Sequence, residues 1–285
     1  MATRRILLTG AGGQLGTDVL AAAEPLDDID LIGLTRAQLD VTDEASVRRI
    51  VGDIAPDVLV HAGAYTAVDA CETNVELAMD VNTNGTANIA RAAESAGAHL
   101  MYISTDYVFD GTKPTPYLES DAPSPASVYG RSKLGGEHAV GPGGLIVRTS
   151  WVCGSHGANM VKTILRIAQQ HQTLTFVDDQ VGKPTFTSDL AAAVVELARD
   201  EHTGVMHVTN EGVVSWYDFC RDVLEAAGLD PERVHPCATD ELDPPRPAPR
   251  PANSVLANTR FSGIGMTLLR DFRAPLAETV ADLTK

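Results

Sequence analysis

Tyr129 and Lys133 lie four residues apart in a stretch whose side chains could transfer a proton. On a helix this spacing places both side chains on one face. There an ammonium group favours the phenolate and makes the phenol a better proton shuttle near neutral pH. Thr105 follows a short apolar run, Leu100–Ile103, that is typical of a buried strand. A hydroxyl, a phenol and an ammonium group together are what carbonyl reduction by a nicotinamide requires.

A Tyr-x-x-x-Lys pair alone is a weak signal, because a chain of 285 residues can contain one by chance. Its meaning depends on whether the chain also builds a dinucleotide site. Glycines spaced three apart stand between an apolar run at 6–8 and a helical stretch. Glycines allow a tight turn and a close backbone approach, and a helix N-terminus favours a pyrophosphate. The alternative is a turn with a packing role only, but the flanking strand and helix favour dinucleotide binding by Gly10, Gly13, Gln14, Leu15 and Gly16.

The end of the second predicted strand, Asp30–Thr35, bears on the choice of cofactor. An acidic residue there would bind the ribose 2′-hydroxyl of NAD, but Arg36 follows the strand instead. Arg36 could pair with a 2′-phosphate, which favours NADPH. The alternative is a solvated surface arginine, so NADH stays open. We also assign to the cofactor site Asp40 and Val41, near the adenine, and the segment Ala62, Gly63, Ala64 and Tyr65, whose small residues let a flat cofactor lie close and whose tyrosine could instead serve packing.

The order of the predicted elements indicates a fold class. Apolar runs typical of strands alternate with helical patterns over the first 150 residues. This β-α-β alternation predicts an α/β, Rossmann-like, doubly wound parallel sheet with ligands at the carboxyl ends of its strands. The residues at these predicted ends are Thr9, Thr35, His61, Thr105 and Arg148. Their agreement supports a site that includes Tyr129 and Lys133.

The sequence changes character after Arg148. We divide the chain into a dinucleotide-binding Rossmann domain over 1–150 and a mainly substrate-binding region over 151–285, with a fuzzy boundary and later segments contributing to the first domain. In the second region the patterns predict helices over 157–171, 188–199 and 215–227, a strand over 205–209 and an extended proline-rich loop over 231–251. Trp151 lies at the predicted mouth of the site, as a substrate-pocket wall or a buried anchor. Asn159 lies on the predicted helix over 157–171, whose polar side chains could meet a diphosphate or form a solvated face.

Composition excludes several classes of protein. The formal net charge is −16, from 22 basic and 38 acidic side chains, which argues against a general binder of nucleic acid or anionic membranes. The four cysteines are far apart and histidines do not cluster, so we expect neither a zinc site nor a disulfide framework. A short basic start at 1–8 runs straight into a strand rather than a signal peptide, and no apolar run is long enough to span a membrane. We therefore expect a soluble cytoplasmic protein.

Segments along nearly the whole chain match a known pattern. They include Thr9-Gly10-x-x-Gly13-Gln14-Leu15-Gly16, Ser104-Thr105-Asp106-Tyr107-Val108-Phe109, Val128-Tyr129-Gly130-x-x-Lys133-x-x-x-Glu137, Arg148-Thr149-Ser150-Trp151 and Arg250-Pro251-x-Asn253-Ser254. On these segments the chain resembles the extended short-chain dehydrogenase/reductase superfamily and, within it, the dTDP-4-dehydrorhamnose reductase family. The second, fourth and fifth segments are the more specific ones.

The resemblance implies that NADPH, or NADH, reduces the C4 ketone of a dTDP-6-deoxy-hexulose to give dTDP-L-rhamnose. It gives Thr105 the role of carbonyl partner, Tyr129 that of proton donor, and Lys133 that of holding the nicotinamide ribose and tuning the tyrosine. Together with Thr105 and Tyr129, the expected substrate-binding residues are Asp106, Val108, Trp151, Asn159 and Arg250. A dTDP-sugar is the expected ligand, and a homodimer is compatible with the resemblance.

The chain also departs from that family. Cys153 stands where an aromatic residue is more common, and Asp18 and Ser188 stand where some relatives carry glutamates of a magnesium site, so we expect no metal. Two rival functions stay open. One is reduction of another dTDP-deoxysugar, as in antibiotic sugar assembly. The other is a non-catalytic dinucleotide-binding role like that of the methionine adenosyltransferase regulatory subunit, a family that lacks the Arg-Thr-Ser-Trp segment present here at 148–151.

Overall fold

The computed structural model describes residues 3–285. The first two residues, with which the predicted basic start and the predicted 1–150 domain begin, lie outside the described residues. The longer strands are β1 (Arg4–Thr9), β2 (Ile29–Leu34), β3 (Val58–His61), β4 (His99–Thr105), β5 (Leu145–Thr149), β7 (Leu174–Val177), β10 (Gly204–His207) and β13 (Val234–Cys237). The short strands are β6 (Val152–Cys153), β8 (Val181–Gly182), β9 (Thr185–Phe186), β11 (Asn210–Glu211), β12 (Val214–Ser215) and β14 (Leu269–Asp271).

Eleven α-helices and a π-helical turn are assigned within residues 3–285. The helices of the first half are α1 (Gln14–Ala23), α2 (Glu44–Ile54), α3 (Val68–Thr73), α4 (Val75–Met79), α5 (Gly85–Ala96) and α6 (Val128–Val140), with the π-helical turn η1 (Asp80–Asn84) between α4 and α5. Those of the second half are α7 (Met160–Gln170), α8 (Thr187–Leu197), α9 (Trp216–Ala226), α10 (Thr259–Gly263) and α11 (Arg273–Leu283). None of these helices combines the length and the apolar character needed to cross a bilayer.

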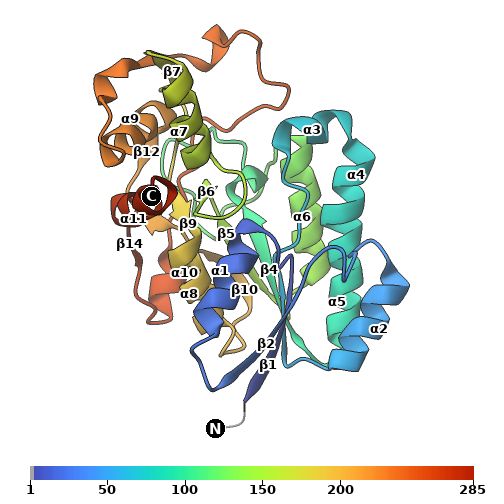
Figure 1. The fold of residues 1–285 in the computed structure, drawn as a ribbon. Helices are drawn as coiled ribbons and strands as arrows, with labels where there is room; N and C mark the ends of the chain where they lie inside the picture. Colours follow the sequence, from blue (N-terminus) through green and yellow to red (C-terminus); the bar gives the residue numbers. More distant parts are fainter. Residues whose placement is uncertain (1–2) are drawn as a thin grey trace.

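A six-stranded sheet organises the molecule, with strand order β10-β5-β4-β3-β1-β2 (Figure 1). All five strand pairs are parallel, so the predicted parallel α/β sheet is confirmed. The strand order reverses beside β1, whose two neighbours are β2 and β3. In doubly wound sheets a crevice opens at the carboxyl ends of the strands at such a reversal, and ligands bind there.

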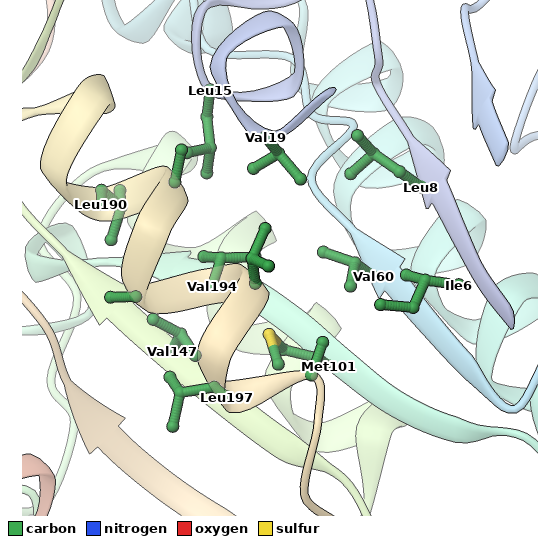
Figure 2. Packing of buried hydrophobic residues seen from close by; sticks show 14 of the residues in the cluster. Ile6, Leu8, Leu15, Val19, Val60, Met101, Val147, Leu190, Val194 and Leu197 are labelled. Carbon is green, nitrogen blue, oxygen red and sulfur yellow. The ribbon is translucent and has the colours of Figure 1, made fainter. Parts of the chain in front are cut away.

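Helices cover both faces of this sheet, and the strand sequences explain why. Successive side chains of a strand point to opposite faces. Ile6 and Leu8 of β1 therefore pack against α1 and α8, as Figure 2 shows, while Leu7 packs on the side of α2 and α5. All three side chains are almost completely buried. Burial on both faces accounts for the continuous apolar runs that mark these strands in the sequence.

Segments after residue 150 complete the large sheet and the helices that cover it. β10 pairs with β5 at the edge of the large sheet, and α8 shares a buried apolar core with α1. The strand predicted at 205–209 is confirmed as a strand, although the sequence did not indicate its place in the large sheet. Three of the other late helices, α7, α9 and α11, lie together (Figure 1), and they enclose a second core that includes Phe219 and Phe272.

Two local predictions are wrong in detail. The amphipathic pattern over 78–96 predicts one long helix, but the π-helical turn η1 interrupts it and adds a residue to one turn beside α6. The proline-rich stretch at 231–251 is not all extended loop, because β13 lies within it and pairs in parallel with β7. Val234 of β13 is buried in the second core, so packing outweighs the local preference of the prolines.

Candidate active site

The turn between β1 and α1 forms one end of the site. Gly10 has a φ of +74°, and a Cβ atom added to it would lie 2.7 Å from the backbone nitrogen of Gly63. A Cβ atom on Gly16 would collide with the carbonyl oxygen of Gly10, so glycine is needed at both positions. Among the described residues, no side chain caps the first turn of α1, which leaves its backbone N–H groups available to an anion. This cradle fits a pyrophosphate.

A cleft of about 870 Å³ extends from this turn along the carboxyl ends of β1, β3, β4 and β5. Its size is that of a site for a small molecule or cofactor. The structure places every residue predicted for the cofactor along this cleft: Gly10, Gly13, Gln14, Leu15, Gly16, Arg36, Asp40, Val41, Ala62, Gly63, Ala64, Tyr65, Tyr129 and Lys133. Their proximity is an observation, and their contact with a cofactor stays a prediction.

Arg36 lies at the rim of the cleft. Its side chain is 79% exposed, and its Nε atom lies 3.9 Å from the Asp40 carboxylate. Asp40 is turned toward the start of α2, where its carboxylate accepts hydrogen bonds from the backbone N–H and the hydroxyl of Thr42 at 3.0 and 2.8 Å. These bonds hold the pKa of Asp40 below its usual value. The guanidinium of Arg36 is thus held only by a long, exposed ion pair and can turn toward a phosphate.

Thr105, Tyr129 and Lys133 meet in the cleft. Thr105 ends β4, and the other two lie one turn apart on α6, so all three reach the same wall and all are buried. The Ser127 hydroxyl accepts a hydrogen bond from the backbone N–H of Gly130 at 3.0 Å and caps the start of α6. This cap fixes the turn that carries Tyr129. The structure therefore brings together the three groups that the sequence predicts for carbonyl reduction.

The acid–base properties of this trio correct one expectation. We expect Lys133 to lower the pKa of Tyr129, but burial raises that pKa above its ordinary value, and the nearby charge of Asp106 adds to the effect. Burial also lowers the pKa of Lys133 to about 7, against the opposing influence of Glu137. Desolvation is the largest cause of both shifts, because it disfavours the charged form of each group. Tyr129 is consequently a protonated phenol at neutral pH.

A buried ion pair lies behind the trio. Glu137, one helical turn after Lys133, accepts two hydrogen bonds from the Arg148 guanidinium at 2.8 and 2.6 Å, and a third from the Ser104 hydroxyl at 2.5 Å. Both charged side chains are at most 4% exposed. Lys133 itself donates a hydrogen bond to the carbonyl oxygen of Ile103 at 2.8 Å. These contacts fix α6 against β4 and β5 and leave the lysine little freedom.

The π-helical turn η1 supplies a clamp that the sequence did not reveal. Asn82 of η1 accepts a hydrogen bond from the backbone N–H of Tyr65 at 2.8 Å and donates one to its carbonyl at 3.0 Å. It donates another to the hydroxyl of Ser132, on α6, at 2.9 Å. The segment after β3 is thereby joined to α6. Asn82 is only 1% exposed, and an asparagine inside an apolar helical pattern was the one signal available.

Asp106 is the most unusual of the predicted substrate residues. It is 2% exposed but lines the cleft. One carboxylate oxygen accepts a hydrogen bond from the Thr105 hydroxyl at 2.9 Å. The other accepts no hydrogen bond of normal geometry among the described residues, although the nearby Ser254 hydroxyl acts to lower the pKa of the carboxyl. Burial raises the pKa of Asp106 to about 6. Because Asp106 lines the cleft beside Thr105, a small rotation of its carboxylate would bring an oxygen to the ligand, where it would accept a hydrogen bond from a sugar hydroxyl.

For Trp151 and Tyr65 the sequence left open whether each side chain lines the site or serves packing, and in the structure each does both. Trp151 lines the cleft and also packs against the second core through an aromatic stack with Trp216. Tyr65 lines the cleft and packs against the small cluster that contains Tyr129. Each side chain therefore serves packing and forms part of the wall.

Three predicted substrate residues do not line the cleft in this structure. Val108 is fully buried in a small cluster with Phe109 and Leu256. Asn159 caps α7 and donates a hydrogen bond to the Gln14 side chain at 3.0 Å, so it touches the cofactor end. Arg250 pairs with Asp69 on α3 through both carboxylate oxygens, at 2.5 and 2.8 Å. Substrate contact by these three stays a prediction.

The sequence missed several residues of the cleft. They come from short segments between recognisable elements, or from late in the chain: Gly12, Leu39, Thr66, Val68, Leu77, Val81, Ile103, Ser104, Tyr107, Thr149, Ser150, Val152, Gly157, Ala158 and Trp216. Most are small or apolar and show no chemical pattern. Within residues 3–285, no three His, Cys, Asp or Glu side chains are grouped closely enough to hold a metal ion.

The family described as RmlD substrate binding domain matches residues 4–285. A dTDP-4-dehydrorhamnose reductase of Mycolicibacterium smegmatis is 43% identical, over 98% of this chain and 85% of that protein. A dTDP-4-keto-6-deoxy-D-glucose reductase of Streptomyces niveus is 38% identical, over 97% and 96%. A crystal structure of dTDP-4-dehydrorhamnose reductase from Bacillus anthracis in complex with NADP has a TM-score of 0.93 at 34% identity, over 98% and 99%.

Proposed function

The chain belongs to the dTDP-4-dehydrorhamnose reductase family, and from this premise we propose that it reduces the C4 ketone of dTDP-4-dehydro-6-deoxy-L-mannose to give dTDP-L-rhamnose. It is an oxidoreductase that uses NADPH, and NADH is a possible substitute. The observation that carries the proposal is the meeting of Thr105, Tyr129 and Lys133 in a cleft whose other end is a glycine cradle for a dinucleotide.

Bound NADPH would supply a hydride to the C4 carbon of the sugar, with its pyrophosphate on the N-terminus of α1 and its ribose against Lys133. Tyr129 gives its phenolic proton to the carbonyl oxygen, so that ketone, hydride and proton together make the alcohol. In this structure the Thr105 hydroxyl donates its one proton to Asp106, and by turning toward the bound sugar it would donate a hydrogen bond to the same oxygen and orient it. Lys133, on the same face of α6, stabilises the phenolate that remains.

The buried state of the trio suits this direction of reaction. A proton donor must hold its proton until the carbonyl arrives, and burial raises the pKa of Tyr129 above its ordinary value. The low dielectric of the site also strengthens the hydrogen bonds that receive the developing charge on the oxygen. Asp106 lies beside Thr105 and can accept a hydrogen bond from a sugar hydroxyl.

Two sugar substrates are worth separating, because a relative from Streptomyces niveus is named for dTDP-4-keto-6-deoxy-D-glucose. Purified protein with NADPH should be given each ketosugar in turn. We expect kcat/KM to be larger for dTDP-4-dehydro-6-deoxy-L-mannose, with dTDP-L-rhamnose as the product by nuclear magnetic resonance. A preference for the D-sugar would assign the protein to another deoxysugar. Cofactor binding without turnover of either would favour the non-catalytic rival.

We also propose that the protein is a homodimer located in the cytoplasm. A homodimer is suggested by the resemblance alone, and light scattering after gel filtration tests it. The four cysteines lie within residues 3–285 and all are free thiols, which supports a reducing compartment such as the cytoplasm. The net charge of −16 supports a protein without nucleic-acid or membrane partners.

A further inference from the structure

The two tryptophans of the chain form one stacked pair at the sugar end of the cleft. Their ring centroids are 3.6 Å apart and their planes differ by 6°. Trp151 follows β5, whereas Trp216 opens α9, and both line the cleft. Thr149 of β5 lies opposite Thr105 of β4 in the sheet register, so Trp151, two residues further on, belongs beside the carbonyl site rather than beside the glycine cradle.

The backbone of Trp151 is strained. Its φ is +47°, in the left-handed region that bulky side chains rarely occupy. Hydrogen bonds hold the chain on both sides: the Ser150 hydroxyl donates to the carbonyl of Lys183 at 2.7 Å, and the backbone N–H of Thr185 donates to the carbonyl of Trp151 at 3.2 Å. Such a conformation persists only where its surroundings determine it.

The surroundings are shaped for the indole of Trp151. One of its faces lies on Trp216, and a Cβ atom added to Gly182 would lie 2.5 Å from its Cε2 atom. Gly182 and the residue before Trp216 belong to paired strands, β8 and β12. Phe219, one turn further along α9, contacts both indoles edge-on, with centroids 6.4 and 5.8 Å away. The stacked ring of Trp216, the space left at Gly182 and the edge-on ring of Phe219 all belong to the second half of the chain.

We propose that Trp216 is a positioning residue, which by stacking holds the indole of Trp151 against the sugar and thereby sets the affinity for the sugar part of the substrate. This inference rests on the proposed function for the identity of the ligand. Trp216 supports the indole of Trp151, lines the cleft beside it and is not part of the glycine cradle. Its loss therefore weakens sugar binding and leaves NADPH binding unchanged.

The test compares Trp216→Leu with Trp216→Phe in the full-length protein. For Trp216→Leu we expect the KM of the ketosugar to rise by about tenfold, since an aromatic stack and a left-handed residue each carry energies of that order. The Kd of NADPH should stay within about twofold of wild type. Trp216→Phe keeps an aromatic ring and should recover most of the affinity. An unchanged KM in Trp216→Leu, or an equal loss of NADPH affinity, would overturn the proposal.

A second readout is independent of activity. Each Trp216 variant leaves Trp151 as the single indole, so its fluorescence quenching by iodide reports how firmly it is held. We expect quenching to be stronger in Trp216→Leu than in Trp216→Phe, and equal quenching would contradict the stack's role. If wild type lacked turnover with every ketosugar, the proposed function would fall, while this comparison would still decide whether Trp216 holds Trp151.

Gly182→Ala tests whether the position of Trp151 sets the affinity for the sugar, without removing an aromatic ring. The new methyl group must displace Trp151, so we expect a rise in the KM of the ketosugar of about the same size as for Trp216→Leu, again without loss of NADPH affinity. Gly52→Ala on α2 is the matched control, because an added Cβ there meets no atom within 4 Å. A Gly182→Ala protein that kept the wild-type KM would contradict the proposal even if Trp216→Leu failed to fold.

Discussion

The two ends of the cleft are built by different means. At the cofactor end the site is built from backbone: a glycine turn, a close approach to the Gly63 backbone and a helix N-terminus that no side chain within residues 3–285 caps. At the sugar end it uses side chains, namely a hydroxyl, a phenol, a carboxylate and a pair of indoles. A backbone cradle tolerates almost no added volume, whereas the shape of a side-chain wall depends on each group that builds it.

The ends also differ in charge and burial. Arg36 at the cofactor end is exposed and weakly paired. At the sugar end Asp106 and Tyr129 are buried, and burial raises the pKa of each. Binding at the exposed end should respond to salt, because exposed charges are screened. Binding at the buried end should respond to pH. Substitutions at each end should therefore give separable effects on NADPH and on the ketosugar.

We expect Tyr129→Phe to show the largest difference between an effect on turnover and an effect on NADPH binding. Removing the hydroxyl removes the proton donor but keeps the ring, so kcat should fall by about 10²–10⁴-fold, the usual contribution of general acid catalysis. The Kd of NADPH should stay within about twofold of wild type, because the glycine cradle is untouched. Single-turnover kinetics and NADPH fluorescence titration measure the two quantities. Turnover close to wild type would remove Tyr129 from the mechanism.

Gly16→Ala should give the opposite pattern. The added methyl group collides with the carbonyl oxygen of Gly10 and must push α1 away from the turn, so NADPH affinity should fall by about tenfold to a hundredfold, as for an overpacked site. The ketosugar KM at saturating NADPH should change little. Gly143→Ala, where an added Cβ meets no atom within 4 Å, is the control. Unaltered NADPH affinity in Gly16→Ala would mean that the cofactor does not bind at this turn.

Asp106→Asn tests the pH response of the sugar end. Burial raises the pKa of Asp106 to about 6, so the carboxylate that accepts a sugar hydroxyl forms only as the pH rises through that value. In wild type kcat/KM should therefore increase with pH through about 6. The variant should lack this step and lose about tenfold at pH 7, since charged hydrogen bonds are the stronger ones. An identical acid limb in wild type and Asp106→Asn would assign the step to another group.

Arg36→Ala should have the smallest effect. The side chain is exposed, so its pairing with a 2′-phosphate should contribute only about threefold to tenfold to NADPH affinity at low salt. NADH affinity should not change, because that cofactor lacks the phosphate. Titration of wild type and variant with both cofactors at two salt concentrations measures this. Equal losses for NADPH and NADH would show that Arg36 does not read the phosphate.

The same contrast explains what could be predicted from the sequence. The glycine turn is contiguous, and its backbone requirement leaves a visible pattern around Gly10 and Gly16. Tyr129 and Lys133 share one helical turn, so their spacing also shows. Trp216 comes from a separate segment, and only packing brings it to Trp151. The pKa of Tyr129 depends on burial, which no residue spacing encodes. For Arg250 the resemblance names a substrate contact, while the structure shows an ion pair with Asp69.

The most direct measurement is NADPH oxidation by the purified wild-type protein, followed by the near-ultraviolet absorbance of the reduced nicotinamide. dTDP-4-dehydro-6-deoxy-L-mannose should be generated in place by upstream enzymes. The account predicts oxidation only when the ketosugar is present, with one dTDP-L-rhamnose formed for each NADPH consumed. Bound NADPH that is not oxidised in the presence of the ketosugar would contradict it.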